Sequence, residues 1–139
     1  MVILDTNVLS ALMSRAPDKR VIAWLDNQPR TSMWTTSVTI LEIQFGLETL
    51  PMGKRRAGLM RAFETLLADK IERRIAPFDA AAAQLAGSLM ATRFRKGRPV
   101  ELRDTMIAGI VLASHATLAT RNTSHFDDLS SPVINPWAV

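Results

Sequence analysis

Short apolar runs alternate along the chain with stretches whose apolar residues recur every three or four positions. The first run, Val2–Leu4, contains no polar residue, as in a strand buried within a parallel sheet. Further strands are predicted over 31–36, 71–78, 117–120 and 132–134, and helices over 8–13, 19–28, 38–50, 59–67, 80–96 and 104–115. This alternation predicts an α/β fold, a three-layer α/β/α sandwich with a mainly parallel sheet of four to five strands.

Polar residues mark the predicted helix starts. Asp18, Ser37 and Asp79 each precede a helical stretch and can accept hydrogen bonds from its first N–H groups. The last helix has almost no polar face, which predicts that it is sandwiched between other elements. Its small residues Ala108 and Gly109 predict a close approach to the sheet.

Composition narrows the class of protein. The 139 residues suit one domain over 1–139, and 47% hydrophobic with 22% charged residues excludes a disordered tail. The absence of cysteine excludes a disulfide scaffold, a thiolate zinc site and a cysteine nucleophile, and it suits a cytoplasmic location. The N-terminus does not resemble a signal peptide, and no apolar run is long enough to predict a membrane span.

Arginine supplies most of the positive charge in a chain of net charge +4. Its guanidinium group suits bidentate contacts to phosphate. The excess therefore permits binding to phosphate groups or to an acidic partner, although a domain with an arginine-rich surface fits the same composition.

Three acidic residues fall where open α/β sheets bind ligands, beyond strand ends and near helix starts. Asp5 directly follows the first strand, Glu42 lies in an apolar stretch, and Asp104 opens the most apolar helix. Each also has an ordinary interpretation, Asp5 and Asp104 as helix caps and Glu42 as an exposed first-turn residue.

Taken together, the three acids indicate a site for a divalent cation. Gathered carboxylates repel one another, and Mg²⁺ relieves the repulsion with oxygen ligands alone. Metal-assisted phosphodiester hydrolysis needs such a set and requires neither cysteine nor histidine. We expect His115 and His125 to lie at the surface without a catalytic role.

Four segments, in order, resemble the motifs of PIN-domain ribonucleases. They are the opening 2–9, the stretch 39–43 with Gly46, the stretch 104–108, and 118–122 followed by Phe126. The tail 135–137 is similar to the FitB-like branch of the VapC toxins. The resemblance runs from Met1 to the C-terminus, and it implies a PIN-like fold.

The resemblance also implies a function and partners. It implies a Mg²⁺- or Mn²⁺-dependent endoribonuclease, the toxin half of a type II toxin–antitoxin pair. Such toxins are usually homodimers inhibited by a small VapB-like antitoxin, whose C-terminal segment lies across the active-site groove. The antitoxin's N-terminal part binds operator DNA, so the toxin meets DNA only through it.

Carried over to this chain, the resemblance makes Asp5, Glu42 and Asp104 the catalytic, metal-binding acids. Asp5 and Asp104 would hold the main ion, and Glu42 would hold it directly or through water. Family members often have a fourth acid where this chain has Asn122, which carries no charge and favours one-metal chemistry. Thr6 and Asn7 would position Asp5 by hydrogen bonds, with a plain turn or cap role open for Asn7.

Two further acids and several arginines complete the candidates. Asp127 and Asp128 follow Asn122 closely, and they either compensate for it or lie on an exposed turn. Basic clusters at 54–56, 73–74 and 93–98 fit an RNA groove, and the last is favoured. The expected phosphate contacts are Arg93, Arg95 and Arg121.

Two other functions are compatible with the sequence. One is a phosphotransferase using Asp5 as nucleophile. That class wants a second aspartate where this chain has Asn7, and it wants a strand-end lysine. The other is a non-catalytic PIN-like module that binds an antitoxin or nucleic acid, for which Asn122 is the argument. Retention of all three acids favours the ribonuclease.

Overall fold

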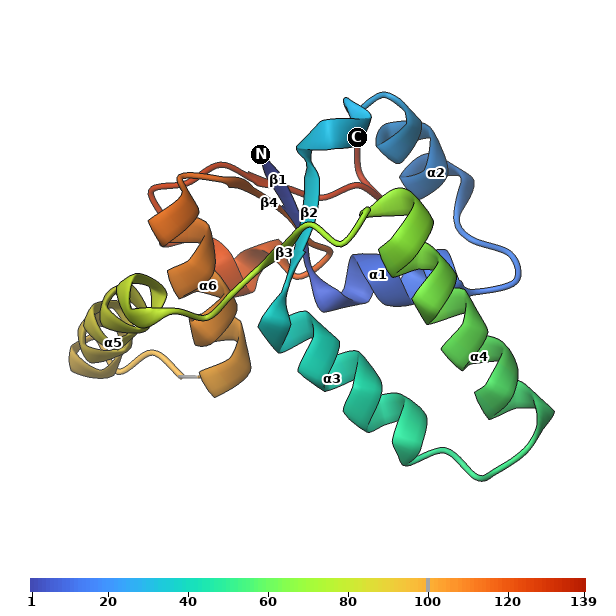
Figure 1. The fold of residues 1–139 in the computed structure, drawn as a ribbon. Helices are drawn as coiled ribbons and strands as arrows, with labels where there is room; N and C mark the ends of the chain where they lie inside the picture. The colour runs from blue at the N-terminus through green and yellow to red at the C-terminus, as the bar shows by residue number, and fades with distance from the viewer. Residues whose placement is uncertain (100) are drawn as a thin grey trace.

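Five parallel strands form one sheet at the centre of the computed structural model, which describes residues 1–99 and 101–139. The strand order is β3-β2-β1-β4-β5 (Figure 1). The strands are β1 (Val2–Leu4), β2 (Met33–Thr36), β3 (Ile75–Ala76), β4 (Thr117–Ala119) and β5 (Val133–Ile134). The most apolar strand, β1, is central, and the short strands β3 and β5 form the edges. The predicted fold class, with a parallel sheet of five strands, is confirmed.

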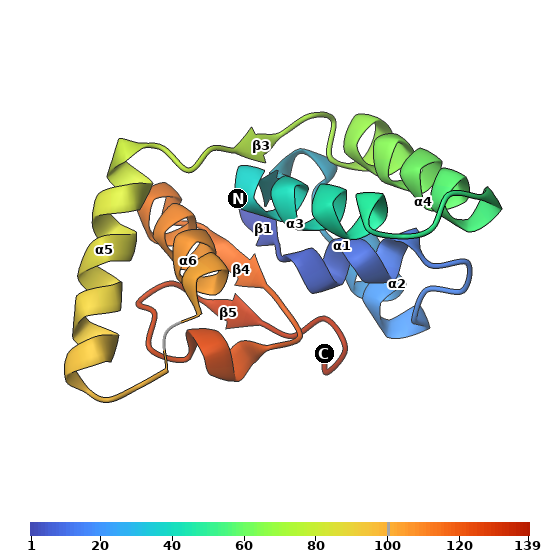
Figure 2. The ribbon, with the colours of Figure 1, turned by 90° about the horizontal axis from the view of Figure 1, so that it is seen from below.

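Six α-helices of the described residues cover the sheet (Figure 2). They are α1 (Thr6–Met13), α2 (Lys19–Asp26), α3 (Ser37–Glu48), α4 (Lys54–Thr65), α5 (Ala80–Arg95) and α6 (Leu102–Ser114). Neighbouring residues of β1 point to opposite faces of the sheet. Leu4 packs with α1, α2, α3 and α4, whereas Ile3 packs with α5 and α6. The two hydrophobic clusters therefore lie between the sheet and the helices on each of its faces, which gives the three-layer arrangement.

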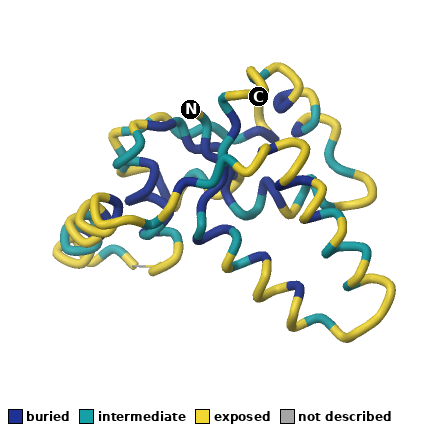
Figure 3. The backbone as a smooth tube through the Cα atoms, viewed as in Figure 1, coloured by how far each residue is buried: buried dark blue, intermediate teal, exposed yellow. Residues whose placement is uncertain are grey.

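The helices α3 and α4 extend beyond the sheet as a hairpin. Buried residues concentrate along the strands, while much of this hairpin is exposed (Figure 3). Leu41 and Phe45 on α3 are 56% and 63% exposed. Within 1–99 and 101–139, no helix has the length and hydropathy to cross a membrane.

The predicted strand 71–78 is largely wrong, because only Ile75–Ala76 pairs with β2. A π-helical turn, Leu66–Lys70, continues α4 instead. Glu72 and Arg73 follow in the left-handed backbone region, with φ of 50° and 58°. A β-prone composition could not reveal this turn.

Two of the predicted caps are confirmed and one is wrong. Asp18 accepts a hydrogen bond from the N–H of Arg20, and Asp79 accepts one from that of Ala82. The cap of α3 is Thr36 rather than Ser37. The hydroxyl of Ser37 accepts instead from the N–H of Phe78, beyond the end of β3.

The close approach predicted for Gly109 of the last helix, α6, is made to α5. A Cβ on Gly109 would lie 2.4 Å from the carbonyl oxygen of Ala82 and 2.7 Å from the Cβ of Ala86. The glycine therefore allows α6 to pack closely on α5, while Ala108 belongs to the hydrophobic cluster that α6 shares with Ile3 and Leu118 of the sheet. The helix also begins earlier than predicted, at Leu102 with Glu101 as its N-cap residue. Asp104 lies inside its first turn, so the cap interpretation of Asp104 is wrong.

Candidate active site

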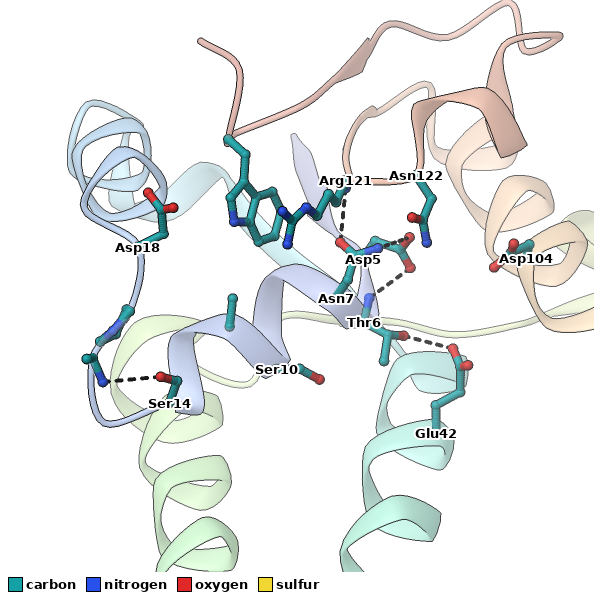
Figure 4. A pocket seen from close by; sticks show the side chains of 14 residues that line it. Asp5, Thr6, Asn7, Ser10, Ser14, Asp18, Glu42, Asp104, Arg121 and Asn122 are labelled. Carbon is teal, nitrogen blue, oxygen red and sulfur yellow. Dashed lines mark hydrogen bonds between the residues drawn. The ribbon is translucent and has the colours of Figure 1, made fainter.

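The three acids of the sequence analysis line one cleft of about 750 Å³ (Figure 4). Asp5 directly follows β1, Glu42 lies in the second turn of α3 after β2, and Asp104 lies in the first turn of α6. Asn122, beyond β4, lines the same cleft. The carboxyl ends of parallel strands share one edge of the sheet, which brings these distant segments together.

Asp5 is held at both of its carboxylate oxygens. Its Oδ1 accepts from the N–H of Thr6 at 2.8 Å, the contact by which Asp5 also caps α1. Its Oδ2 accepts from the hydroxyl of Thr120 at 2.8 Å and from the amide of Asn7 at 3.5 Å. Asn7 in turn accepts from the N–H of Arg121 at 3.1 Å, which ties α1 to the end of β4. Both residues expected to position Asp5 contact it.

Burial raises the pKa of Asp5 to about 6. The residue is only 3% exposed, and loss of water disfavours its charged form. The hydrogen bonds from Thr120 and Thr6 act in the opposite direction, while the charges of Asp104 and Glu42 raise the pKa further. A cation bound beside Asp5 would stabilise the charged form of its carboxyl group.

Glu42 is oriented by threonines from two elements. Its Oε1 accepts from the hydroxyl of Thr6 at 2.8 Å, and Thr6 lies 3.0 Å from the hydroxyl of Thr39. Its other oxygen, Oε2, lies 3.8 Å from Nε of Arg103. Glu42 is therefore a half-buried member of the cleft and not the exposed first-turn residue of the alternative interpretation.

Asp104 contacts a histidine that sequence reasoning set aside. Nδ1 of His125 lies 2.8 Å from Oδ2 of Asp104, and the ring is half exposed. His125 lies at the surface as expected, but it also touches a candidate metal-binding acid. Its loop position in the sequence contained no signal of this contact.

The donor set fits a divalent cation that keeps part of its water. Three carboxylates and one amide face a cleft open to solvent, and oxygen donors are what Mg²⁺ prefers. In the part of the chain that the structure describes, no three acidic or histidine side chains stand close enough to form a complete cage. Mg²⁺ commonly binds through one or two carboxylates and several waters, so a complete cage is not required.

The sequence matches the PIN domain family over residues 2–131. The chain belongs to the PIN-domain family. The expected resemblance, including that to the VapC and FitB toxins, is thereby confirmed.

Named relatives of this PIN domain cover its whole length. It is 36% identical to VapC ribonuclease Y4jK of Sinorhizobium fredii, over 99% of this chain and 98% of the relative. It is 31% identical to toxin FitB of Neisseria gonorrhoeae, over 99% of both chains. A solved structure of FitAB bound to an IR36 DNA fragment is similar at a TM-score of 0.89 with 30% identity, covering 100% of this chain and 97% of that chain.

The structure corrects the role expected for Arg93 in this PIN domain. Arg93 is 3% exposed, and its Nε and Nη2 each lie 2.8 Å from an oxygen of Asp128. It also donates to the carbonyl oxygen of His125 at 3.0 Å and to the hydroxyl of Thr105 at 3.3 Å. Four of the five N–H donors of this buried guanidinium are bonded within the protein, so Arg93 is not available as a phosphate contact. Arg93 instead fixes the turn that carries His125.

The acids that follow Asn122 do not replace a fourth ligand. Asp128 pairs with Arg93, which lowers the pKa of the Asp128 carboxyl, and Asp127 pairs with Arg98 at 2.7 Å. Neither residue lines the cleft. The interpretation of Asp127 and Asp128 as compensating acids is therefore wrong.

The two other predicted phosphate contacts differ in position. Arg121 lines the cleft, with its guanidinium carbon 5.0 Å from the centre of the Trp137 ring. This cation–π contact holds the charge beside the acids. Arg95 is exposed at the last turn of α5 and does not line the cleft.

Proposed function

We propose that this chain is a metal-dependent endoribonuclease and the toxin of a type II toxin–antitoxin system. The observation that carries the proposal is the convergence of Asp5, Glu42 and Asp104 in one cleft with a buried Asp5 of raised pKa. The relatives named ribonuclease and toxin, which match this chain end to end, support it.

Asp5 and Asp104 would hold one Mg²⁺ or Mn²⁺, with Glu42 assisting and Asn122 at the fourth position. When bound, the cation lowers the pKa of water and offsets negative charge on the phosphate. The residues of the chain supply the rest of the site. Thr6 and Thr120 keep the oxygens of Asp5 fixed, and Thr6 also orients Glu42.

Arg121, at the other side of the cleft, would donate hydrogen bonds to a non-bridging oxygen of the phosphate. Its cation–π contact with Trp137 limits its rotamers, so less conformational entropy is lost when phosphate binds. In-line attack of water on phosphorus, with departure of the 3′ oxygen, leaves a 5′-phosphate and a 3′-hydroxyl. Together these residues bind the substrate and orient the groups that bind the cation.

The partners follow from the same proposal. FitAB is known bound to DNA, and this chain is 30% identical over its full length to a chain of that structure. We therefore expect a VapB-like antitoxin as inhibitor, operator DNA contacted only through it, and a homodimeric toxin. We expect the protein to act in the cytoplasm, where it would meet its RNA substrate.

Cleavage of an RNA pool by purified, antitoxin-free protein tests the proposal. Wild type, Asp5→Asn and Asp26→Asn are each compared with Mg²⁺, with Mn²⁺ and with chelator. Asp26 is an exposed acid outside the cleft and serves as the matched control. We expect metal-dependent cleavage by wild type and Asp26→Asn, and a loss of about 10³-fold or more for Asp5→Asn.

The second candidate is the non-catalytic PIN-like module, favoured by Asn122 and by the absence of a complete acidic cage in the described residues. It predicts no cleavage by any protein and no metal-induced rise in melting temperature. Full activity of Asp5→Asn would instead remove Asp5 from the mechanism.

A further inference from the structure

A second hollow of about 670 Å³ lies beside the acidic cleft, between α1 and α4. Ser10 and Ser14 line both the cleft and the hollow, which makes the two continuous. Figure 4 shows these serines along α1, with Ser14 at the end far from Asp104. An extended ligand bound at the three acids can therefore continue along α1 into the hollow.

The rim of the hollow carries three exposed cations, Arg15, Lys54 and Arg55. Within residues 1–99 and 101–139, none of them forms an ion pair. The cations near the opposite side of the cleft are neutralised, since Arg93, Arg98 and Arg103 all have acidic partners. Among the cations that line the cleft or the hollow, those without an acidic partner in the described residues are Arg121 in the cleft and these three at the rim of the hollow.

The position of these cations is unfavourable for the isolated protein. Lys54 and Arg55 occupy the first turn of α4, where the helix dipole repels positive charge. That turn contains no acidic residue, and Gly53 provides no capping side chain. An anion bound beside Lys54 and Arg55 would offset this unfavourable charge.

The floor of the hollow is apolar. Met13 and Leu59 line it, half-buried where they pack over the core between α1 and α4. A polyanion with apolar planar groups matches cations above an apolar floor. Single-stranded RNA has this chemistry, because its unpaired bases are free to leave the stack, while duplex RNA keeps them paired.

We propose that this hollow, with Arg15, Lys54 and Arg55 at its rim, carries the phosphate backbone of single-stranded RNA leading to the acids. The inference rests on the proposed ribonuclease function and assigns the direction in which the substrate lies. Phosphates contact the three cations, and a base rests against Met13 and Leu59. Of the cluster favoured from sequence, 93–98, Arg93 and Arg98 are paired with acids, and Arg95 and Lys96 line neither the cleft nor the hollow.

The experiment measures RNA binding separately from cleavage. In an Asp5→Asn background with chelator present, Lys54→Gln/Arg55→Gln is compared with Lys70→Gln/Lys96→Gln by fluorescence anisotropy. The control removes two exposed cations outside both hollows, so the two variants have equal net charge. The probes are a labelled 12-nucleotide single-stranded RNA, the matching duplex and a poly-glutamate peptide.

We expect the α4 variant to bind the single strand about tenfold more weakly at low salt, with a salt slope lower by about 1.4 for two lost contacts. The control should lose only the affinity due to net charge. The α4 variant should fold as well as its parent, because two cations leave a helix N-terminus. In the active protein, cleavage of a 12-mer should fall while cleavage of a trinucleotide, too short to reach the hollow, stays unchanged.

Three results would overturn the inference while leaving the ribonuclease proposal standing. They are equal loss in both variants, loss of duplex affinity equal to that of the single strand, or loss of poly-glutamate binding alone. The last result would assign the hollow to an acidic protein segment. Absence of RNA binding and cleavage by the parent proteins would instead contradict the proposed function.

Discussion

The two flanks of the cleft, one formed by α5 and α6 and the other by α4, differ in whether their arginine and lysine side chains have acidic partners. On the α5–α6 flank, Arg93 is buried and bonded to Asp128, and Arg98 is paired with Asp127. On the α4 flank, Lys54 and Arg55 are exposed and lack an acidic partner among the described residues. Among the cations that line the hollows of the two flanks, the same residue types thus build structure on one side and leave charge available on the other.

The backbones of the two flanks differ in the same sense. Gly109 on α6 lies against the backbone of α5, with no room for a methyl group. Gly58 on α4 has only the Nη2 of Arg61 near its missing Cβ, at 3.9 Å. The α5–α6 flank is closely packed and fixes Asp104 and His125, while the α4 flank keeps a hollow open. A basic cluster in a sequence indicates binding only where the fold leaves it without a partner.

The largest effect that we expect is a difference in the free energy of unfolding between two variants, one lacking the buried Arg93 and the other lacking the exposed Arg55. Arg93→Ala removes a buried side chain and leaves the carbonyl oxygen of His125 and the hydroxyl of Thr105 without this donor, so it should lower the free energy of unfolding by about 2–4 kcal/mol. Arg55→Ala should change it by less than about 0.5 kcal/mol. Urea denaturation of both variants measures the contrast. Equal effects would mean that the flanks do not differ as described.

The two glycines provide a smaller test of the same contrast. Gly109→Ala places a Cβ against the Ala82 carbonyl and should destabilise the protein by about 1–3 kcal/mol. Gly58→Ala fills open space in a helix and should stabilise it by about 0.5–1 kcal/mol. Thermal unfolding of the pair is the measurement, and a stabilising Gly109→Ala would contradict the close packing of α6 on α5.

The smallest of the three contrasts concerns Asp5, which lies between the flanks. Its folded pKa of about 6 is above the ordinary value of 3.8, so the folded protein holds this proton more tightly than the unfolded chain. Stability from this group is complete below pH 4 and is lost as the pH rises through 6. Asp5→Asn should therefore be more stable than wild type by about 1–2 kcal/mol at pH 7 in chelator.

A second aspartate of the cleft is the control for that pH dependence. Arg20 lowers the pKa of the half-buried Asp18 carboxyl to about 2, so Asp18 stays charged throughout the range from pH 4 to 6 in the folded protein. Asp18→Asn should keep the wild-type slope of stability over that range, whereas Asp5→Asn should lose part of it. Unfolding free energies at four pH values would decide, and parallel curves for Asp5→Asn and wild type would contradict the buried state of Asp5.

The sequence predicted elements whose signal is local. The apolar run of β1 and the caps Asp18 and Asp79 depend on neighbouring residues, and each formed as expected. The three acids were identified because each lies next to a strand end or a helix start, and their common cleft follows from the parallel sheet.

The errors over Arg93, His125 and Gly109 involve partners distant in the sequence. Arg93 and Asp128 are 35 residues apart, and His125 and Asp104 are 21 apart. No spacing rule connects such residues. Gly109 was correctly identified as a point of close approach, but its neighbour turned out to be α5 because the facing small residues, Ala82 and Ala86, lie on another helix.

The position of β1 has a consequence for synthesis of the protein. Its neighbour β4 lies near the end of the chain, and the N–H of Asp5 donates to the carbonyl of Ala119 at 2.9 Å. A nascent chain translated only as far as α6 therefore contains all three acids but lacks the strand that completes their setting. Since domains form as their residues leave the ribosome, the cleft assembles only after β4 has been made and has paired with β1. A chain terminated early would carry the acids without the site.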